Sequence, residues 1–407
     1  MVRKLKILLS AYACEPNKGS EPEVGWKWAT TLSKLGHEVY VITRQNNKEN
    51  IENYLTNKKI PNLYFYYFDY SPWFIKIIKG KTNPRSYLYF FLWQIGIFFL
   101  ARQMVKKIKF DFIHHVTFVS LRFPSFLCFL KVPFIFGPVA GGETSPYHLR
   151  KNWLFFNKIT ELFRDLSNYY IKVSLFMNIT FSRSYKIFVT SEETKKVIPS
   201  RYHFKTEKLL AIGFDETSKP NSKSRSNAGL FNICYVGRLI YWKGLLIVLK
   251  TFSEIKKKNK NAILSIVGSG PMDTELKLQA KKLNIDQSIQ WLGQIDRKEL
   301  INFFNNKCDL LLMPSLRDSG GLVILEAMSC GVPVAALNLG GPGQLVDNEC
   351  GIKIEVDNKS EDQIAFELST LINDSIKNAD ELKNKKTKSL ERVKKFTWDK
   401  KISRIYK

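Results

Sequence analysis

The chain has 407 residues, of which 44% are hydrophobic and 25% are charged, and its formal net charge is +26. This composition excludes an intrinsically disordered chain. The length exceeds what one ordinary hydrophobic core organises, so two domains are expected. The surplus of positive charge favours anionic partners, which include phosphorylated small molecules, anionic lipid and nucleic acid.

The first 215 residues alternate short apolar runs with longer amphipathic ones. Helices are predicted between several of the apolar runs, for example at 23–35 and 159–176. Such alternation is typical of a mostly parallel sheet with helices on both faces. The apolar runs predict buried strands at residues 6–10, 38–43, 63–68, 112–114, 134–136, 187–190 and 209–212.

A polar stretch at residues 216–230, which contains Pro220, interrupts this rhythm and is predicted to be a linker. The rhythm then restarts, so we predict two doubly wound, Rossmann-like α/β domains in tandem, 1–215 and 231–385, facing a central cleft. Loops at the carboxyl ends of such strands bind ligands. Strands of the second domain are predicted at 231–236, 263–267, 289–292, 310–314, 333–336 and 352–354.

The six cysteines form no Cys-x-x-Cys pair, which disfavours zinc ribbons and thioredoxin-like sites. Most of them lie in apolar segments, so we expect small buried side chains in a reducing compartment. The N-terminal apolar run is too short for a signal peptide. No segment is expected to reach the ~18–20 apolar residues of a membrane span.

The turn after the predicted strand 231–236 carries the first binding motif. Gly237 allows a tight turn at the strand end, and Arg238 and Lys243 place two cations at the carboxyl edge of the sheet. A guanidinium and an ammonium can bind a diphosphate together. Two surface cations on an ordinary loop remain the alternative interpretation.

A sharper motif spans residues 313–333. A predicted strand ends in a glycine-containing turn that opens a helix, and the N–H groups of residues 320–323 form an anion site, because helix N-termini carry a partial positive charge. Asp318 and Glu326 flank this turn and could hold sugar hydroxyls. Alternatively, Asp318 only caps the helix. Glu326 lies in an apolar helix, where a carboxylate without a partner is costly. The predicted donor residues of the turn are Ser319, Gly320, Gly321, Leu322 and Val323.

These two motifs resemble the donor site of glycosyltransferase family 4, the glycosyl transferases group 1. The resemblance implies the GT-B fold and a retaining, metal-independent transferase, and it covers nearly the whole chain. The family has two glutamates where this chain has Asp318 and Glu326. The family also has a Gly-Gly-x-x-Glu loop, and in this chain Gln344 stands at the position of its glutamate. The resemblance also implies that a C-terminal helix at 386–407 crosses back to the N-terminal domain.

The N-terminal half supplies further candidates. Gly19 and Ser20 occupy the loop that approaches the donor phosphates in the family, although a plain loop before a helix is the alternative. At the end of the strand at 112–114, His114 and His115 point to opposite faces. The resemblance assigns the active-site histidine to His115, so the predicted catalytic residues are His115, Asp318 and Glu326.

We therefore predict an enzyme, a bacterial surface-polysaccharide glycosyltransferase that uses a UDP- or GDP-sugar, with no cofactor and no metal. Leaving diphosphate would be stabilised by Arg238, Lys243 and helix amides, and the sequence contains no Asp-x-Asp motif. Alternatives are a catalytically inactive partner subunit, a GT-B phosphorylase with a pyridoxal cofactor, and a nucleic-acid-binding protein, for which no base-reading module is found.

Residues 71–109 combine aromatic side chains with flanking lysines and arginines. One interpretation is an interfacial segment that contacts anionic lipid and so meets a lipid-linked acceptor on the inner face of the plasma membrane. The other is a core helix of the first domain with basic ends. The sequence leaves both interpretations open.

Overall fold

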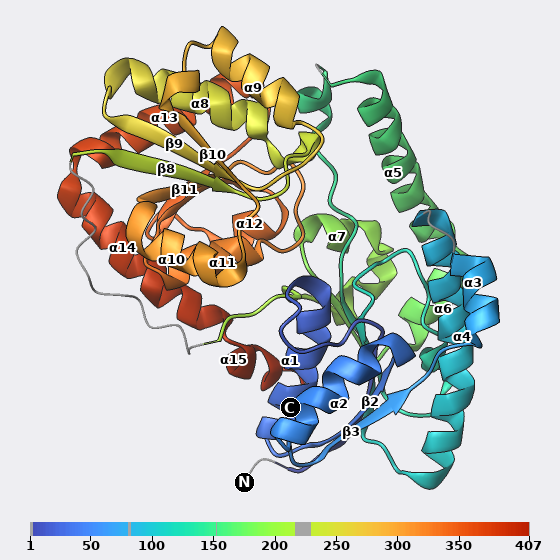
Figure 1. Ribbon diagram of the computed structural model, residues 1–407. Helices are drawn as coiled ribbons and strands as arrows, with labels where there is room; N and C mark the ends of the chain where they lie inside the picture. Colours follow the sequence, from blue (N-terminus) through green and yellow to red (C-terminus); the bar gives the residue numbers. More distant parts are fainter. Residues whose placement is uncertain (1–2, 80–82, 152, 216–228, 407) are drawn as a thin grey trace. The chain divides into compact units, whose positions relative to one another are not determined.

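The computed structural model describes residues 3–79, 83–151, 153–215 and 229–406. These residues form two compact units, and neither unit is contiguous in sequence (Figure 1). Unit 1 contains Met1–Gly142, Asp165–Ile212 and Trp398–Lys407, and unit 2 contains Glu143–Arg164 and Gly213–Thr397. Most of the predicted linker, residues 216–228, lies outside the described residues.

Unit 1 is built on a seven-stranded sheet with the order β3-β2-β1-β4-β5-β6-β7. All of its strand pairs are parallel, and the first six strands have the order of a dinucleotide-binding Rossmann sheet. The strands are β1 (Lys6–Ala11), β2 (Glu38–Thr43), β3 (Leu63–Tyr67), β4 (Phe112–Thr117), β5 (Phe134–Val139), β6 (Lys186–Val189) and β7 (Thr206–Lys208).

Helices pack on both faces of this sheet, because alternate residues of each strand point to opposite sides. Ile7 and Leu9 join one buried cluster with α1 and α15, whereas Leu8 joins another with α4. The helices are α1 (Ser20–Lys34), α2 (Lys48–Asn57), α3 (Pro72–Lys79), α4 (Asn83–Lys107), α6 (Leu175–Arg183), α7 (Glu192–Val197) and α15 (Trp398–Ile402). Helix α5 (Phe155–Val173) is one continuous helix whose first half counts with unit 2 and whose second half counts with unit 1.

Unit 2 repeats this architecture with a six-stranded parallel sheet of order β10-β9-β8-β11-β12-β13. Counted from β8, this is the same strand order as in unit 1. The strands are β8 (Phe231–Val236), β9 (Ala262–Val267), β10 (Ile289–Gly293), β11 (Leu310–Met313), β12 (Val334–Leu337) and β13 (Gly351–Ile354).

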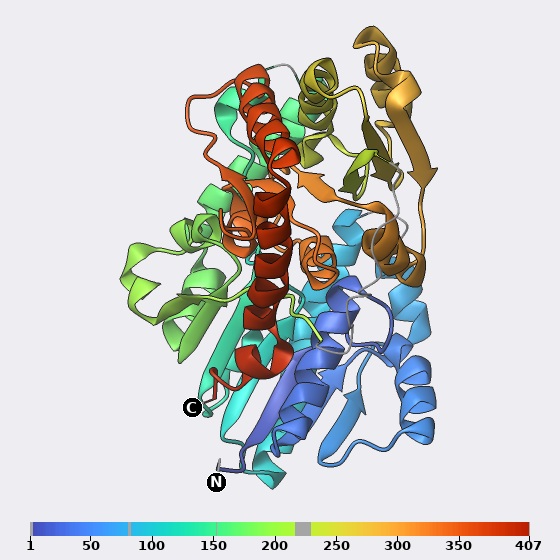
Figure 2. The ribbon, with the colours of Figure 1, turned by 90° about the vertical axis from the view of Figure 1, so that its left-hand side faces the viewer.

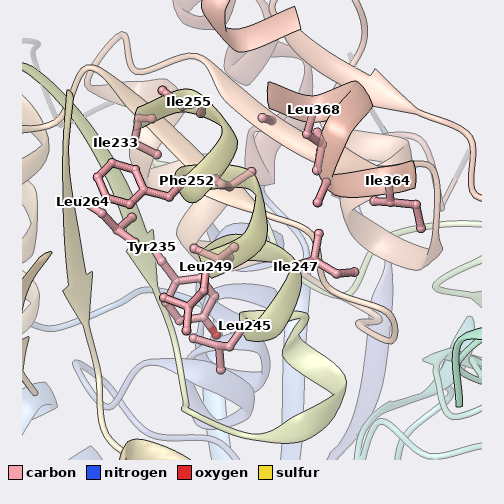
Figure 3. Close-up of a cluster of buried hydrophobic side chains, with 14 of the residues drawn as sticks. Ile233, Tyr235, Leu245, Ile247, Leu249, Phe252, Ile255, Leu264, Ile364 and Leu368 are labelled. Atoms are coloured by element: carbon pink, nitrogen blue, oxygen red, sulfur yellow. The ribbon is translucent and has the colours of Figure 1, made fainter. Parts of the chain in front are cut away.

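The core of unit 2 lies between β8, β9 and the helices α8 and α13, as Figure 3 shows for Ile233, Leu264, Phe252 and Leu368. Helix α14, drawn in red in Figure 2, packs against α11 and α13. The helices are α8 (Leu245–Lys258), α9 (Asp273–Lys282), α10 (Arg297–Lys307), α11 (Leu322–Ser329), α12 (Gly340–Leu345), α13 (Glu361–Lys377) and α14 (Ala379–Val393).

The contact-defined units differ from the predicted domain boundaries in two places. Residues 143–164, which we call the arm, were expected in the N-terminal domain but count with unit 2, where Leu149 and Trp153 join the core. Of the predicted C-terminal helix at 386–407, the part up to Thr397 stays with unit 2, and only Trp398–Lys407 counts with unit 1. In both places a segment belongs to the unit whose core its side chains join, whatever its position along the chain.

The predicted pair of Rossmann-like sheets is confirmed, and the strands at Glu38–Thr43 and Phe231–Val236 lie where they were expected. One predicted strand, 209–212, is wrong, because β7 ends at Lys208. Beyond it, the carbonyl oxygens of Leu210, Ala211 and Ile212 accept hydrogen bonds from the buried Lys401 ammonium instead. All six cysteines are buried, as expected, and none of them is part of a disulfide.

Within the described residues, one helical segment, Tyr87–Lys107 of α4, is long and apolar enough to cross a membrane by length and composition alone. This corrects the expectation that no segment would pass that test. One side of the helix, with Phe90, Trp93 and Ile97, is buried in the core of unit 1. Its other side exposes Leu88 and Phe99. Helix α4 is therefore a core helix along one face, which is the second of the two interpretations of residues 71–109.

Candidate functional site

The turn that follows β8 carries the two predicted cations. It is fixed to the neighbouring strand end by hydrogen bonds from Gly237 N to Val267 O (2.9 Å) and from Leu239 N to Ser269 O (2.9 Å). The turn ends at Gly244, which has φ 72°, and a Cβ atom there would lie 2.0 Å from the carbonyl oxygen of Pro314. Only glycine therefore allows this turn to approach the end of β11 so closely.

The turn that follows β11 is joined to the first turn through Asp318. One carboxylate oxygen of Asp318 pairs with the ammonium of Lys243, and both side chains are about one-seventh exposed (16% and 14%). The other carboxylate oxygen accepts a hydrogen bond from the amide of Gly320 (3.1 Å). Asp318 therefore shapes the turn and holds the cation. It does not cap α11, because the N-cap of that helix is Gly321 and no side chain caps it there. Its predicted contact with sugar hydroxyls stays a prediction.

A third turn, after β12, packs against the second. Gly341 N donates to the carbonyl oxygen of Asp318 (2.8 Å). A Cβ atom at Gly341 would lie 2.2 Å from the carbonyl oxygen of Gly320, and one at Gly340 would lie 2.1 Å from that of Asp318. Gln344 turns back on its own helix and donates to the carbonyl oxygen of Gly340 (3.1 Å). Three strand-end turns thus meet at Asp318, the third of them at its backbone carbonyl oxygen.

Positive potential at these turns has two further sources. Arg238 is exposed, and within the described residues no hydrogen bond or ion pair of its guanidinium is found. Helix α11 begins after Gly321, which has φ 95°, and the amides of a first helical turn have no intrahelical acceptor. The amide of Gly320 is already bound to Asp318, so Leu322 and Val323 are the better anion-binding amides of the predicted set.

Glu326, the second predicted carboxylate, lies on the first turns of α11 and is 8% exposed. Its Oε1 forms an ion pair with Arg297 Nε (2.8 Å), and Arg297 is half exposed at the start of α10. This ion pair with Arg297 offsets the free-energy cost of burying the Glu326 carboxylate in an apolar helix. The structure therefore links Glu326 to the turn that follows β10, which the sequence did not bring into the site.

The arm contributes a carboxylate that sequence reasoning missed. Glu161 is fully buried, and its Oε1 accepts hydrogen bonds from the guanidinium of Arg317 and from the hydroxyl of Tyr241 (3.1 Å). Arg317, which precedes Asp318, also lies over the ring of Trp242 at 4.3 Å. Burial and the Glu161 carboxylate raise the pKa of Tyr241 to about 12. One acidic side chain thereby fastens the first two turns to each other.

A second carboxylate of the arm lies beside the third turn. Glu143 is 3% exposed, and its Cγ lies 3.6 Å from the position that a Cβ atom would take at Gly340. Its backbone oxygen accepts a hydrogen bond from Arg164 (2.7 Å). No motif in the sequence marks Glu143 or Glu161, because both stand far from the glycine-rich turns along the chain.

The remaining predicted residues belong to unit 1. Gly19, with φ 66°, immediately precedes α1, and Ser20 is its exposed first residue. The carboxylate of Glu21 accepts a hydrogen bond from the amide of Val119, so this loop is tied to the chain that follows β4. Burial raises the pKa of Glu21. Glu21 is therefore a further titratable group beside the predicted loop.

His114 and His115 do point to opposite faces of the sheet, as the strand predicts. His114 contacts Trp28, whereas His115 lies against Phe136. Nε2 of His114 donates to the carbonyl oxygen of Gly137, so its Nδ1 accepts a hydrogen bond from the Tyr406 hydroxyl. Both rings are essentially unexposed, and burial lowers the pKa of His114 to about 3 and that of His115 to about 4.

His115 is thus a neutral, buried imidazole at neutral pH. Its Nε2 lies 3.2 Å from the carbonyl oxygen of Phe118, and within the described part of the chain nothing hydrogen-bonds its Nδ1. His115 was expected at the open edge of the predicted cleft. In the structure, the aromatic side chains around β4 enclose its ring instead. A catalytic role for His115 stays a prediction.

Among the described residues, no three His, Cys, Asp or Glu side chains lie close enough together to hold a metal ion. The expected metal independence therefore stays a prediction, as do the donor-binding roles of the individual residues. What the geometry of unit 2 shows is a set of three turns joined by close backbone contacts. These turns carry the cations Arg238, Lys243 and Arg317 and the carboxylate of Asp318, and further buried carboxylates lie in α11 and the arm.

Comparison with known proteins agrees with this geometry. Residues 217–389 match the family described as "Glycosyl transferases group 1". The glycogen synthase of Mycobacterium tuberculosis is 31% identical over 140 residues, which are 34% of each chain. The alpha-monoglucosyldiacylglycerol synthase of Streptococcus pneumoniae is 24% identical over 328 residues, which are 75% of this chain and 65% of that one. The chain matches about a third to a half of the length of several such relatives.

The fold is also found among solved structures. Anabaena HepE in complex with UDP superposes with a TM-score of 0.63 at 16% identity, over 98% of both chains. Identity at this level shows the fold alone, and that fold has two Rossmann-like units, as here. The chain therefore has the GT-B fold, and its residues 217–389 are similar to the glycosyl transferases group 1 family.

Proposed function

We propose that this chain is a retaining, metal-independent glycosyltransferase. In this proposal it moves a sugar from a UDP- or GDP-sugar to a hydroxyl of a glycan or lipid-linked acceptor, in the synthesis of a bacterial surface polysaccharide. The observation that carries the proposal is the meeting of three strand-end turns around Asp318, with Lys243 paired to it and Arg238 exposed nearby along the same turn. The names of the matched relatives and the UDP complex of HepE support a nucleotide-sugar donor.

The charges of these turns suit the chemistry of a leaving diphosphate. As the glycosidic bond breaks, negative charge accumulates on the phosphate oxygens, and preorganised cations and amides stabilise that charge most effectively. The ion pair with Asp318 holds the Lys243 ammonium in position before a donor arrives. Retention would follow if the acceptor hydroxyl attacks from the face of the leaving group while a phosphate oxygen takes its proton.

The acceptor is proposed to be lipid-linked, with the protein on the inner face of the plasma membrane. Two observations support this part. The chain carries a net charge of +26, which favours an anionic surface. The matched relative from Streptococcus pneumoniae is named for a glycolipid product. No cofactor is proposed.

A catalytically inactive partner subunit is the second candidate, and one observation favours it. The carboxylate of Asp318 is already occupied on both oxygens, by Lys243 and by the amide of Gly320. An aspartate so engaged has little capacity left for a donor sugar, whereas a longer glutamate would reach further. Donor turnover separates the two candidates.

The test uses the full chain and a panel of UDP- and GDP-sugars. We expect one nucleotide-sugar to raise the melting temperature and to be hydrolysed slowly without acceptor, with or without EDTA. NMR of the released sugar before mutarotation should show the donor's anomeric configuration. Arg238→Ala should weaken donor binding, whereas Lys282→Ala, an exposed cation at the end of α9, should not. No response to any donor would overturn the enzymatic proposal, and activity lost in EDTA would overturn metal independence.

A further inference from the structure

Helix α5 carries a continuous apolar face that is turned to solvent. Nine apolar or aromatic residues recur at helical spacing from Phe155 to Val173, within one face of the helix. Eight of them are more than half exposed, between 54% for Leu166 and 79% for Phe156, and the ninth, Ile159, is half-buried. The eight exposed residues are Phe155, Phe156, Leu162, Phe163, Leu166, Tyr169, Tyr170 and Val173.

The opposite face of α5 is polar apart from Ile171, and it is the face that the protein buries. Glu161 is fully buried in its bonds with Arg317 and Tyr241. Asn168 is 7% exposed and is hydrogen-bonded to Arg122 and to the carbonyl oxygen of Gly142. An ordinary surface helix buries its apolar stripe and exposes its charges. Helix α5 does the reverse, so folding of the chain leaves its apolar stripe without a cover.

The charges around this stripe are almost entirely positive. Lys151, Lys158 and Lys172 are exposed. The two acidic residues of the whole stretch 144–191 are Glu161, which is buried, and Asp165, which is half-buried. The stripe continues into α6 with the exposed side chains of Leu175 and Phe176.

We propose that the exposed face of α5 docks in the plane of an anionic lipid membrane. An apolar stripe with bulky aromatic side chains and a cationic border is the combination that inserts into the headgroup region of such a bilayer. The 19 residues of α5 give a helix roughly 28 Å long, which suffices for contact along the surface. A second copy of the chain fits this face less well, because its lysine border would meet a like border.

This inference deepens the lipid-linked acceptor of the proposed function and relocates the membrane contact. The sequence had suggested residues 71–109, but α4 buries one face in the core. Contact through α5 would place a membrane directly beside the arm that fastens the donor turns, since the arm ends within the same helix. A glycosyltransferase anchored in this way would meet acceptors whose lipid part stays in the bilayer.

The test is sedimentation of the full chain with vesicles of phosphatidylcholine and phosphatidylglycerol, and with vesicles of phosphatidylcholine alone. We expect binding to the anionic vesicles that weakens in high salt. Combined replacement of Phe156→Ser, Phe163→Ser and Tyr170→Ser should lower the bound fraction about tenfold or more. A second variant, with Lys151→Glu, Lys158→Glu and Lys172→Glu, should lose the preference for anionic lipid.

Two matched controls keep the result specific. Phe204→Ser, Leu278→Ser and Phe366→Ser remove three exposed apolar side chains elsewhere and should leave vesicle binding unchanged. Trp73→Ser with Phe99→Ser tests the earlier candidate region 71–109 and should have a small effect. Thermal unfolding of each variant confirms that the fold is intact.

Several outcomes would overturn the proposal. They are absence of binding to anionic vesicles, equal binding by the Phe156→Ser, Phe163→Ser and Tyr170→Ser variant, and a wild-type dimer in ultracentrifugation that this variant abolishes, since the face would then join two copies. Donor-induced thermal stabilisation is measured in parallel without lipid. Donor response without vesicle binding would reject the docking surface alone, and vesicle binding without donor response would reject the proposed chemistry alone.

Discussion

The two sheets share one strand order, yet the ends of their central strands hold polar groups in opposite states. In unit 1, His114 and His115 are enclosed by aromatic side chains, and burial lowers the pKa of each. In unit 2, Lys243 and Asp318 remain partly exposed as an ion pair. The comparison teaches that topology places chemistry at the same edge of both sheets, whereas burial decides whether that chemistry is charged.

The charged edge of unit 2 can be broken by removing its cation. Lys243→Ala should lower donor turnover about 10²–10³-fold, because charge on the leaving diphosphate loses a preorganised partner. The melting temperature should also fall, because the largely buried Asp318 carboxylate loses its ion-pair partner. Lys243→Arg should retain part of the rate, and Lys282→Ala should retain all of it. A folded Lys243→Ala protein with the wild-type rate would remove this lysine from the mechanism.

The neutral edge of unit 1 predicts a pH dependence of stability. The pKa of His115 is about 4 in the folded chain and about 6.5 when unfolded. Above about pH 6.5 the imidazole is neutral in both states and has no effect. Between about pH 6.5 and about pH 4, only the unfolded chain binds the proton, so the free energy of unfolding should fall, on the order of 3 kcal/mol for this residue.

Urea unfolding across that range, followed by tryptophan fluorescence, measures the loss. His115→Asn should make the pH dependence shallower between about pH 4 and about pH 6.5. A stability profile of His115→Asn parallel to that of the wild type would show that His115 is not held neutral by the fold.

The arm offers a smaller test within unit 2. Glu161→Gln keeps the shape of the side chain but removes the charge that Arg317 and Tyr241 share, so it should lower the free energy of unfolding by about 2 kcal/mol and raise the donor KM. The double variant Glu161→Gln, Arg317→Gln should lose less free energy of unfolding than the sum of the losses of the two single variants. Glu275→Gln, an exposed carboxylate of the same unit, is the matched control. Full additivity would argue against a coupled pair.

The smallest expected effect is that of Asp318→Glu. The longer side chain keeps the charge beside Lys243 but loses the short bond to the Gly320 amide, which should lower the free energy of unfolding by about 1 kcal/mol. Donor turnover should change less than tenfold. Steady-state kinetics of the wild type and of Asp318→Glu measures this change in turnover. A loss as large as that of Lys243→Ala would mean that the length of the residue-318 side chain controls the reaction.

The elements that could be predicted from the sequence are the strands formed by continuous runs of apolar residues. Strands buried on both faces, such as Phe231–Val236, stand out from their amphipathic neighbours, and glycines mark the turns that follow them. The cations and Asp318 could be found because they lie within these turns. The docking of Gly341 against Gly320 is consistent with the glycine pattern, although only the structure shows the contact.

The parts that the sequence did not predict depend on partners far along the chain. Glu161 stands opposite an apolar stripe, so its position predicts a solvated side chain. Its partner Arg317 lies 156 positions further along the chain. The strand expected at 209–212 failed for the same reason, because Lys401 captures its carbonyl groups. Periodicity reports which face is apolar, but it does not report which face the rest of the chain covers.

The interleaving of the two units has a consequence for biosynthesis. Trp398, Ile402 and Tyr406 pack into the core of unit 1 beside Trp28, and the Tyr406 hydroxyl accepts a hydrogen bond from the Trp28 indole. The core of unit 1 therefore stays incomplete until residues 398–406 are synthesised, which at roughly 5–20 residues per second follows residue 212 by tens of seconds. Until then the apolar side of α1 that these residues cover is exposed to solvent.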